Sequence, residues 1–470
     1  MLWLSIDRQL ERPLTEQIYT QIKKKILQAE LKANERLPST RQLAQDLCVS
    51  RNITIEAYER LMAEGYIETR QGSGTYVSYG AHFELNQHMS LSDINEERSP
   101  SDDQNVTNFR SGIPDLRLFP RAIWAKLTYN TIHDCDYKAL SYSNPEGLLE
   151  LREQLVNYLL KVRGVQCHSS QIVITSGATQ ALSLVAKLLL SKEDQIIMED
   201  PITEDIQSIF SSSGAIIQGI PVDHNGLQTD LIKQHERLNA IFVTPSHQFP
   251  LGSTLPIQRR IHLIHVARAA DCYIVEDDYD SEFRHEGAPV SSLQGLDPTR
   301  VIYVGSFSKI LSPALRIGYL VLPQPFIQKC REYKWFSDLH TPSVEQLTLA
   351  RFIEKGYLER HILKMKKVYR KRRDLLIHLL HKTFPNQLSI TGHSTGLHLI
   401  AEWHDLHFSN KIIETIRTNG VYLYPVEDHS IEKGHHTKKV IFGYGHLNEE
   451  EIHEGIRRLS KILNEIDLIS

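Results

Sequence analysis

The segment 79–106 constrains the fold most, because it divides the chain into two parts. Ser, Asp, Glu and Asn dominate it, as in DINEERSPSDD at 93–103, and it has no apolar periodicity. Such a segment cannot bury enough apolar surface to fold alone, and its charges repel one another. It predicts a flexible acidic linker, with an arm docked on a domain as the alternative. With 470 residues, the chain is long enough for separate domains at 1–78 and 107–470.

The first part has the pattern of a winged helix-turn-helix. Apolar residues four apart predict a helix over 13–29, and a capping box at Ser39 predicts a second helix through 47. After a turn at 48–49, Ser50 can cap a third helix over 51–64, which Gly65 ends. Segments 67–69 and 75–77 then predict a hairpin, the wing.

A helix-turn-helix places the start of its second helix in the major groove of DNA. The candidate DNA-binding residues are therefore Ser50, Arg51, Asn52 and Thr54 at base edges, Thr40 and Arg41 at phosphates, and Gly72 and Gly74 in the wing. Helical hairpins of this kind also occur as interaction modules, which is the alternative.

The charge distribution limits how such a module binds DNA. Residues 1–78 carry 11 Lys and Arg against 10 Asp and Glu, 79–106 carry 1 against 6, and 107–470 carry 41 against 41. The net charge of −4 therefore comes from the middle segment. Since the first part is barely basic, DNA binding must come from a local face and from dimerisation.

Beyond residue 107, short apolar segments alternate with helical ones. Strands are predicted at 171–175, 195–199, 240–243, 273–276, 301–305 and 318–321. This order predicts an α/β domain around a mostly parallel sheet. One long helix over 345–380 is expected to lead to a smaller α/β domain at the C-terminal end.

Residues at the ends of these strands suit a pyridoxal phosphate (PLP) site. Lys309 supplies an amine for an imine, Asp277 an acid for the pyridine nitrogen, Tyr279 a phenol for the ring oxygen, and Arg316 a cation for the phosphate. TSGAT at 175–179 follows a strand and opens a helix, whose free N–H groups can hold a phosphate. A capping Asp, a solvated Lys and the rival carboxylates Asp278 and Asp280 are the alternatives.

Three classes of protein are disfavoured. The five cysteines are scattered without a CxxC pair, which favours inert thiols in a reducing cytoplasm over a metal site or disulfides. The N-terminus lacks the pattern of a secretory signal, and the most apolar helix is too short to span a membrane.

Two sets of short sequence motifs resemble those of known families. LPSTRQLA at 37–44, AYERL at 57–61 and GSGTYV at 72–77 resemble the GntR-type winged helix. LSYSNPEG at 140–147, TPSHQFPLG at 244–252, EDDYDSEFR at 276–284 and SFSK at 306–309 resemble fold-type I aminotransferases. Together they resemble the MocR/GabR regulators over nearly the whole chain. The expected fold is a winged helix-turn-helix, a linker, and an aminotransferase-like domain with a large sheet domain and a small C-terminal domain.

The resemblance implies a role for each cofactor residue. Lys309 would form the internal aldimine, Asp277 would pair with the pyridine nitrogen, and Tyr279 would face the ring oxygen. The phosphate would be held by Ser176, Gly177, Ala178, Ser306, Ser308 and Arg316. Tyr142 would reach the phosphate of the partner subunit, which implies a homodimer, and His247 and Gln248 would lie near the ring oxygen.

Two departures from the family bear on the ligand. Thr203 stands where relatives often place an aromatic ring over the cofactor. Segments 420–425 and 439–444 lack the Arg with which amino-acid-binding members hold a carboxylate. The sequence therefore predicts a cytoplasmic PLP-dependent regulator that binds operator DNA and senses PLP, as PdxR-type members that control vitamin B6 metabolism do, or an amine that reacts with PLP. A working aminotransferase and a GabR-like amino acid sensor are the alternatives.

Overall fold

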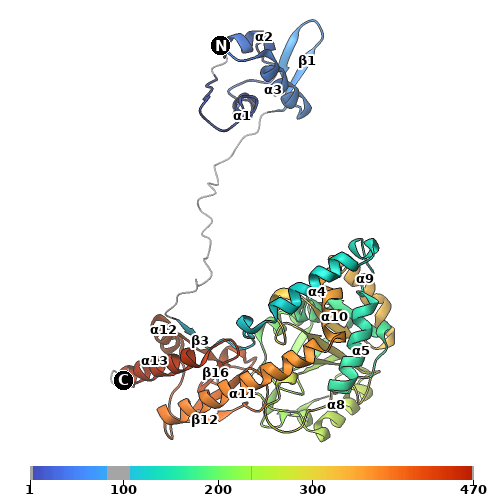
Figure 1. Cartoon of the computed structure of the whole chain (residues 1–470), viewed down its shortest axis with the longest axis vertical. Helices are drawn as coiled ribbons and strands as arrows, with labels where there is room; N and C mark the ends of the chain where they lie inside the picture. The colour runs from blue at the N-terminus through green and yellow to red at the C-terminus, as the bar shows by residue number, and fades with distance from the viewer. Residues whose placement is uncertain (1–3, 82–105, 234, 468–470) are drawn as a thin grey trace. The chain divides into compact units, whose positions relative to one another are not determined.

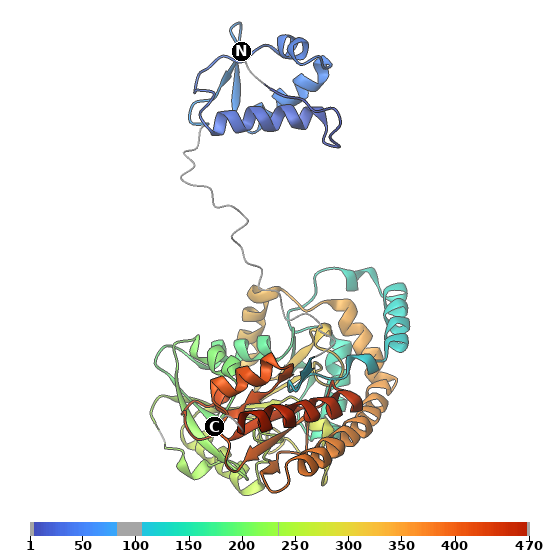
Figure 2. The same ribbon diagram turned by 90° about the vertical axis from the view of Figure 1, so that its left-hand side faces the viewer.

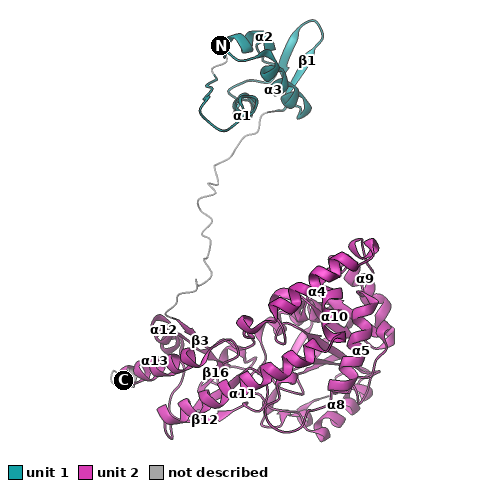
Figure 3. Ribbon diagram, in the orientation of Figure 1, with its two compact units in different colours: residues 1–101 teal, residues 102–470 magenta. Residues whose placement is uncertain are grey.

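The computed structural model describes residues 4–81, 106–233 and 235–467, which form two compact units (Figure 3). Unit 1 comprises residues 1–101 and unit 2 residues 102–470. Most of the expected linker, at 82–105, lies outside the described residues.

Unit 1 is a winged helix-turn-helix, as predicted. Its elements are α1 (Leu14–Leu27), α2 (Thr40–Asp46), α3 (Arg51–Ala63), β1 (Ile67–Arg70) and β2 (Gly74–Val77), with β1 and β2 antiparallel (Figure 1). Ile18, Ile22 and Ile26 of α1 are completely buried in a core that α3 and the hairpin complete. The four-residue apolar spacing therefore marks the inward face of α1.

The helix ends of unit 1 agree with their sequence signals, with one difference. The Ser39 side chain accepts a hydrogen bond from the Gln42 backbone at 3.1 Å and caps α2. Gly65, just beyond α3, has a φ of +77°, which only glycine adopts freely. Ser50 precedes α3, but its side chain makes no capping hydrogen bond, so its hydroxyl is left for another partner.

Unit 2 contains an eight-stranded sheet in the order β4-β11-β10-β9-β8-β5-β6-β7. Six strands are parallel, while β11 and β7 run antiparallel to their neighbours. The strands are β4 (Ile172–Thr175), β5 (Gln195–Asp200), β6 (Ile216–Asp223), β7 (Gly226–Leu227), β8 (Leu238–Val243), β9 (Tyr273–Asp278), β10 (Val301–Ser306) and β11 (Gly318–Val321). All six predicted strands are present, and the prediction of a mostly parallel sheet is confirmed.

Helices cover both faces of this sheet because its central strands are apolar on both sides. Along β10, Ile302 and Val304 pack into one core with α6, whereas Val301 and Tyr303 face two others on the opposite side. The covering helices are α4 (Arg121–Asp134), α5 (Leu149–Arg163), α6 (Ala178–Leu189), α7 (Glu204–Ser211), α8 (Ile257–Ala269), α9 (Ile327–Asp338) and α10 (Ser343–Glu354).

The prediction of a single helix over 345–380 is wrong. The structure has two helices there, α10 and α11 (Tyr357–Thr383), separated at Lys355 and Gly356. Gly356 has a φ of +66°, a left-handed conformation that ends one helix and redirects the chain.

The small C-terminal domain packs a four-stranded antiparallel sheet against helices, as expected. Its strands are β12 (Leu388–Thr391), β13 (His398–Trp403), β16 (Lys439–Gly443) and β15 (Tyr424–Pro425), and its helices include α12 (Asn410–Thr418) and α13 (Glu449–Asp467), red in Figure 2. β3 (Thr107–Asn108) pairs with β14 (Val421–Tyr422), so the start of unit 2 belongs to this domain. No helix among the described residues is long and apolar enough to cross a bilayer.

Candidate cofactor site and nucleic-acid interface

The large sheet brings together site residues that lie far apart in the sequence. Asp277 of β9 is opposite Val304 of β10, and Ser306, at the end of β10, is opposite Gly318 of β11. Gly318 is in turn opposite Thr175 at the end of β4, just before Ser176. The carboxyl ends of the parallel strands therefore meet at one edge, where α/β sheets bind their ligands.

Lys309 lies three residues beyond β10 with its amine over a ring. Its Nζ is 3.7 Å from the ring centroid of Tyr279, and a Cβ added at Gly112 would lie 3.1 Å from its Cε. Burial lowers the pKa of Lys309, while Asp280 and Asp277 act in the opposite direction. Because the net change is downward, more of the amine is neutral, the form that attacks a carbonyl.

Asp277 is a buried carboxylate whose Oδ1 lacks a hydrogen-bond partner among the described residues. Burial raises its pKa to about 7, although Lys309 partly opposes this. A buried carboxylate without a partner is costly, and a bound cation would remove the cost. The site thus fits a ligand with a protonated ring nitrogen, as PLP has.

A phosphate would fit at the start of α6. Gly177 precedes this helix with a φ of +103°, and Ala178 is its first residue. A Cβ added at Gly177 would lie 3.1 Å from Nη2 of Arg316, so the guanidinium lies against the helix start. Free backbone N–H groups and a guanidinium together suit a dianion.

The three serines expected at the phosphate differ in their contacts. The Ser308 backbone N–H donates to Ser306 Oγ at 3.2 Å, which holds both residues in one turn after β10. Ser176 Oγ donates to Asp338 Oδ2 at 3.1 Å, and Asp338 is ion-paired with the fully buried Lys334. The Ser176 hydroxyl is thus engaged by a carboxylate.

Tyr279, His247 and Gln248 meet around one loop. The Tyr279 hydroxyl donates to the backbone oxygen of His247 at 2.8 Å. The Gln248 amide donates to the backbone oxygens of Pro201 and Phe249, and its oxygen accepts from Leu251. These bonds make Gln248 a support of the loop.

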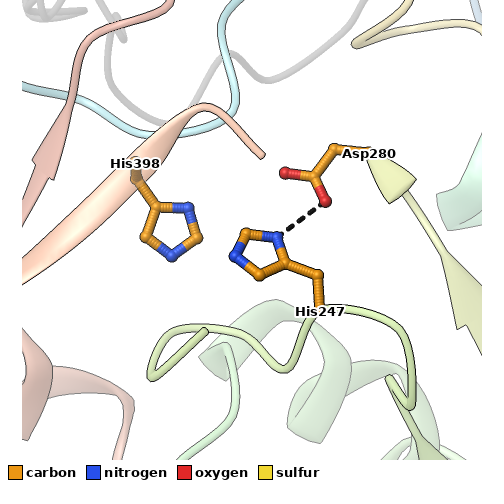
Figure 4. Close-up of side chains that lie close together, drawn as sticks. All are labelled: His247, Asp280 and His398. Carbon is orange, nitrogen blue, oxygen red and sulfur yellow. Dashed lines mark hydrogen bonds and ion pairs between the residues drawn. The ribbon is translucent and has the colours of Figure 1, made fainter. Parts of the chain in front are cut away.

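The sequence analysis did not indicate three features around this loop. These are the contact of Asp280 with His247, the ring of Phe249, and the approach of His398. His247 Nδ1 lies 2.8 Å from Asp280 Oδ1, and all three polar side chains are buried (Figure 4). Ligand atoms of His247, Asp280 and His398 lie within 4.8 Å of one another, but His398 Nε2 is hydrogen-bonded to the backbone oxygen of Pro250. His398 belongs to β13 of the small domain, and no motif near Lys309 indicates it.

Unit 1 exposes most of the residues predicted to bind DNA. Ser50, Arg51 and Asn52 at the start of α3 are exposed, as are Arg41 of α2 and Gly72 of the wing. Thr40 and Gly74 are half-buried. Arg36, which the sequence analysis missed, borders the wing, since a Cβ added at Gly74 would lie 3.1 Å from its Nε.

The prediction for Thr54 is wrong. Its side chain is completely buried, and its hydroxyl donates to the backbone oxygens of Thr40 and Arg51 at 2.9 Å. Position 54 lies three residues after Arg51, on the face of α3 that packs against α2. Thr54 therefore fixes the two helices relative to each other.

Replacing Arg51 by alanine is expected to weaken operator binding about 10- to 100-fold, because one bidentate contact to a base or phosphate contributes about 1–3 kcal/mol. Fluorescence anisotropy with an operator fragment at fixed salt measures the loss. Arg60→Ala is the matched control, since Arg60 lies in the last turn of the same helix. Equal losses of operator affinity in the two variants would contradict the assignment of the start of α3 as the DNA-binding part of the helix.

Comparisons with known proteins match both units. Residues 14–77 match the family of bacterial regulatory proteins, gntR family, and residues 104–459 match aminotransferase class I and II. The chain is 32% identical to the probable rhizopine catabolism regulatory protein MocR of Rhizobium meliloti, over 97% of this chain and 95% of that protein. It is 30% identical to the pyridoxine biosynthesis transcriptional regulator PdxR of Corynebacterium glutamicum, over 93% of both chains. The crystal structure of Pyrococcus horikoshii kynurenine aminotransferase, with PMP, matches 81% of this chain and 98% of its own, with 28% identity and a TM-score of 0.72.

Proposed function

The chain belongs to the MocR subfamily of GntR-type transcriptional regulators. We propose that it senses PLP, or an amine that reacts with PLP, and that this ligand changes its affinity for operator DNA. In this proposal residues 1–78 read DNA, 107–470 bind the ligand, and 79–106 connect them. The observation that carries the proposal is the buried carboxylate of Asp277, at the same sheet edge as Lys309, whose Oδ1 has no hydrogen-bond partner in the residues that the structure describes.

The cofactor of unit 2 is PLP. When bound, it supplies an aldehyde that reacts with amines. Lys309 would hold it covalently, and Asp277 would neutralise its ring nitrogen. Gly177, Ala178 and Arg316 would bind its phosphate, with Ser306 and Ser308 beside them. Tyr279 and His247 lie where they would orient the ring oxygen.

Regulation requires that the ligand favour one arrangement of the protein. A coupling of about 1–3 kcal/mol between ligand and operator suffices, and by linkage the operator must change PLP affinity by the same factor. A role in controlling vitamin B6 metabolism is the specific form that we infer. The PdxR relative is named for regulating pyridoxine biosynthesis. A regulator of vitamin B6 synthesis that senses PLP would respond to the end product of that synthesis.

We further propose that the protein acts as a homodimer. Tyr142, expected to reach the phosphate of the partner subunit, is 78% exposed. Several large apolar side chains of unit 2 are also exposed, namely Tyr129, Ile132, Tyr137, Leu140 and Phe336. A second copy would cover such side chains, since large apolar surfaces on soluble proteins mark interaction sites. A dimer also implies paired operator half-sites.

The decisive experiment measures operator binding by the purified cofactor-free protein during titration with PLP, and then with amines. A change on adding PLP alone supports sensing of PLP itself. A change only when PLP and an amine are both present supports sensing of the amine. An operator affinity that neither addition alters refutes the proposal.

A working aminotransferase is the second candidate, favoured by one observation. The lowered pKa of Lys309 suits a group that moves protons in transamination. Steady-state transfer of amino groups at more than about 1 per second would support this activity. Turnover far below that rate, together with a PLP-dependent operator affinity, would leave sensing as the function.

A further inference from the structure

The C-terminal end of α9 lies against the loop that would hold the phosphate of the cofactor. We call residues 176–178 the phosphate loop. Ser176 Oγ donates to Asp338 Oδ2 at 3.1 Å, so the last residue of α9 holds a residue just before α6. A second link comes from Gln180, whose Oε1 accepts from the Ser176 backbone at 2.8 Å and whose amide donates to Ser337 Oγ at 3.2 Å. The phosphate loop is therefore tied to α9 through both the hydroxyl and the backbone of its first residue.

A buried lysine holds Asp338 in place. The Lys334 side chain is completely buried, and its ammonium group is ion-paired with Asp338 Oδ1 and donates to Thr341 Oγ1 at 3.3 Å. Asp338 thus uses one carboxylate oxygen for Lys334 and the other for Ser176. Burial opposes the ionisation of Asp338, but the hydrogen bond from Lys334 in particular lowers its pKa below the ordinary value. The carboxylate is therefore ionised at neutral pH.

The chain turns sharply after Asp338, in a conformation that is rare for a residue with a side chain. Leu339 has a φ of +61° and a ψ of −69°, and the His340 N–H donates to the backbone oxygen of Asp338 at 2.7 Å. These are the features of a γ-turn with positive φ, which is strained. The turn brings Thr341 back to the same buried ammonium group, and the Thr341 hydroxyl donates to the backbone oxygen of Ile174 at 3.4 Å. Strain of this kind persists only where the surrounding contacts hold it, and it is common at ligand-binding sites.

Stability of the fold alone does not account for this arrangement. A buried ion pair often stabilises a fold less than apolar side chains of similar volume do, and Leu339 adds backbone strain. Ile327 and Cys330 of the same helix pack into an apolar core with α6, so an apolar side chain at position 334 would extend that core. The ion pair is instead connected to the phosphate loop, at the point where α6 begins.

The phosphate loop would bind a phosphate through its backbone, so its position decides how well it binds. The first N–H groups of α6 have no acceptor within the helix. Arg316 lies against Gly177, and a Cβ added at Gly318 would lie 2.8 Å from the Gly177 Cα, so the loop is supported from two sides. Asp338 supports it from α9. Hydrogen bonds to an anion depend on distance and angle, so the loss of one support would weaken the binding of phosphate.

We propose that Lys334 and Asp338 are a positioning pair, which fixes Ser176, and through it the start of α6, so that the phosphate loop binds the phosphate of PLP. Neither residue of the pair contacts the phosphate. The pair therefore sets the preference of the protein for a phosphorylated over an unphosphorylated aldehyde. The inference rests on the proposed function, since it requires PLP at Lys309, and it assigns a role to two residues that the proposed function does not use.

PLP and pyridoxal test the inference, because both aldehydes can react with Lys309 but only PLP carries a phosphate. Each is titrated into the cofactor-free full-length protein, and the visible band of the bound aldehyde gives its affinity. Lys334→Met combined with Asp338→Ala removes one cation and one anion, so the net charge is unchanged. We expect this double variant to bind PLP about tenfold more weakly, the effect of one lost hydrogen bond to a charged group, and pyridoxal with a change of less than about twofold. An equal loss for both aldehydes, or no loss for PLP, would overturn the inference.

Lys329→Met combined with Glu332→Ala is the matched control. Both residues are exposed on the same helix, and their replacement also leaves the net charge unchanged. The control is expected to bind both aldehydes as the unaltered protein does. A loss of PLP affinity as large as that in the Lys334 and Asp338 variant would indicate a general effect of α9 and would refute the role of the pair.

A measurement on the unaltered protein does not depend on the folding of a variant. Hydrogen exchange followed by mass spectrometry reports how often the backbone of 334–341 opens. We expect PLP to slow exchange in this segment, because a bound phosphate stabilises the loop that the segment supports, and pyridoxal to leave it unchanged. Equal protection by the two aldehydes, or none by PLP, would overturn the inference even if the double variant does not fold.

Failure of the inference and failure of the proposed function are distinguishable. If the unaltered protein does not develop a visible band with PLP, the proposed function fails before any variant is compared. If the band forms but the double variant keeps the full preference for PLP over pyridoxal, the inference fails and the proposed function stands.

Discussion

Lys309→Ala is expected to abolish both the covalent retention of PLP and every PLP-dependent change in operator affinity. In the proposed function, the half-buried amine over Tyr279 is the nucleophile at the sheet edge where Asp277 and Arg316 also lie. Without it, PLP is held by its phosphate and ring contacts alone. The coupling to DNA, about 1–3 kcal/mol in the unaltered protein, falls to zero.

Two measurements check this expectation. Borohydride reduction followed by mass spectrometry locates the retained cofactor on a peptide, and anisotropy gives the operator affinity with and without PLP. Lys309→Arg keeps the charge but removes the nucleophile, so it should behave like the alanine variant. Lys187→Ala, on the exposed side of α6, is the matched control. Normal PLP-dependent operator binding by Lys309→Ala would contradict the mechanism.

The sequence predicted those parts of the site that lie at strand ends. Lys309, Asp277 and Ser176 each follow or end an apolar segment, and parallel strands bring such positions to one edge of the sheet. The outline of unit 1 was likewise predictable, because the spacing of Ile18, Ile22 and Ile26 directly records the buried face of α1.

The contacts missed by the sequence analysis depend on tertiary packing. His398 reaches the site from β13 of the small domain, and nothing in the spacing of residues around Lys309 signals that approach. Thr54 has the polarity of a DNA-contacting residue, yet packing of α3 on α2 buries it. The Ser176–Asp338 hydrogen bond joins residues 162 positions apart. In each case the outcome was set by packing between distant segments, which local patterns do not encode.

The two carboxylates at the end of β9, Asp277 and Asp278, differ in their contacts. Asp277 has a raised pKa, and its Oδ1 lacks a hydrogen-bond partner within the described part of the chain. Its neighbour Asp278 is ion-paired with Arg163 at 2.6 Å and accepts from the Tyr303 hydroxyl at 2.6 Å. Burial acts to lower the pKa of Arg163, but Asp278 and the neighbouring acidic groups together raise it above its ordinary value. Two adjacent carboxylates of one strand thus differ in their partners: Asp277 Oδ1 has none among the described residues, and Asp278 is ion-paired in the core.

Asp277→Asn is therefore expected to stabilise the cofactor-free protein while weakening PLP binding. The folded-state pKa of Asp277 is about 7, against 3.8 ordinarily, so the folded state resists ionisation. Its cost is absent below about pH 4, grows as pH rises to about 7, and is constant above that. The gain in free energy of unfolding should be on the order of 2–4 kcal/mol at pH 8 and much smaller at pH 5. Urea unfolding followed by tryptophan fluorescence measures it, since Trp124, Trp335 and Trp403 all lie in unit 2.

Asp278→Asn is the matched variant with the opposite expected sign. It leaves the buried Arg163 without its counter-charge, and breaking such a pair costs about 3–5 kcal/mol. One atom changes in each variant, on neighbouring residues of the same strand, so a general effect of removing a carboxylate would move both in the same direction. If Asp277→Asn destabilises the cofactor-free protein at pH 8, the carboxylate has a partner in solution and is not held in reserve for the ring nitrogen of PLP.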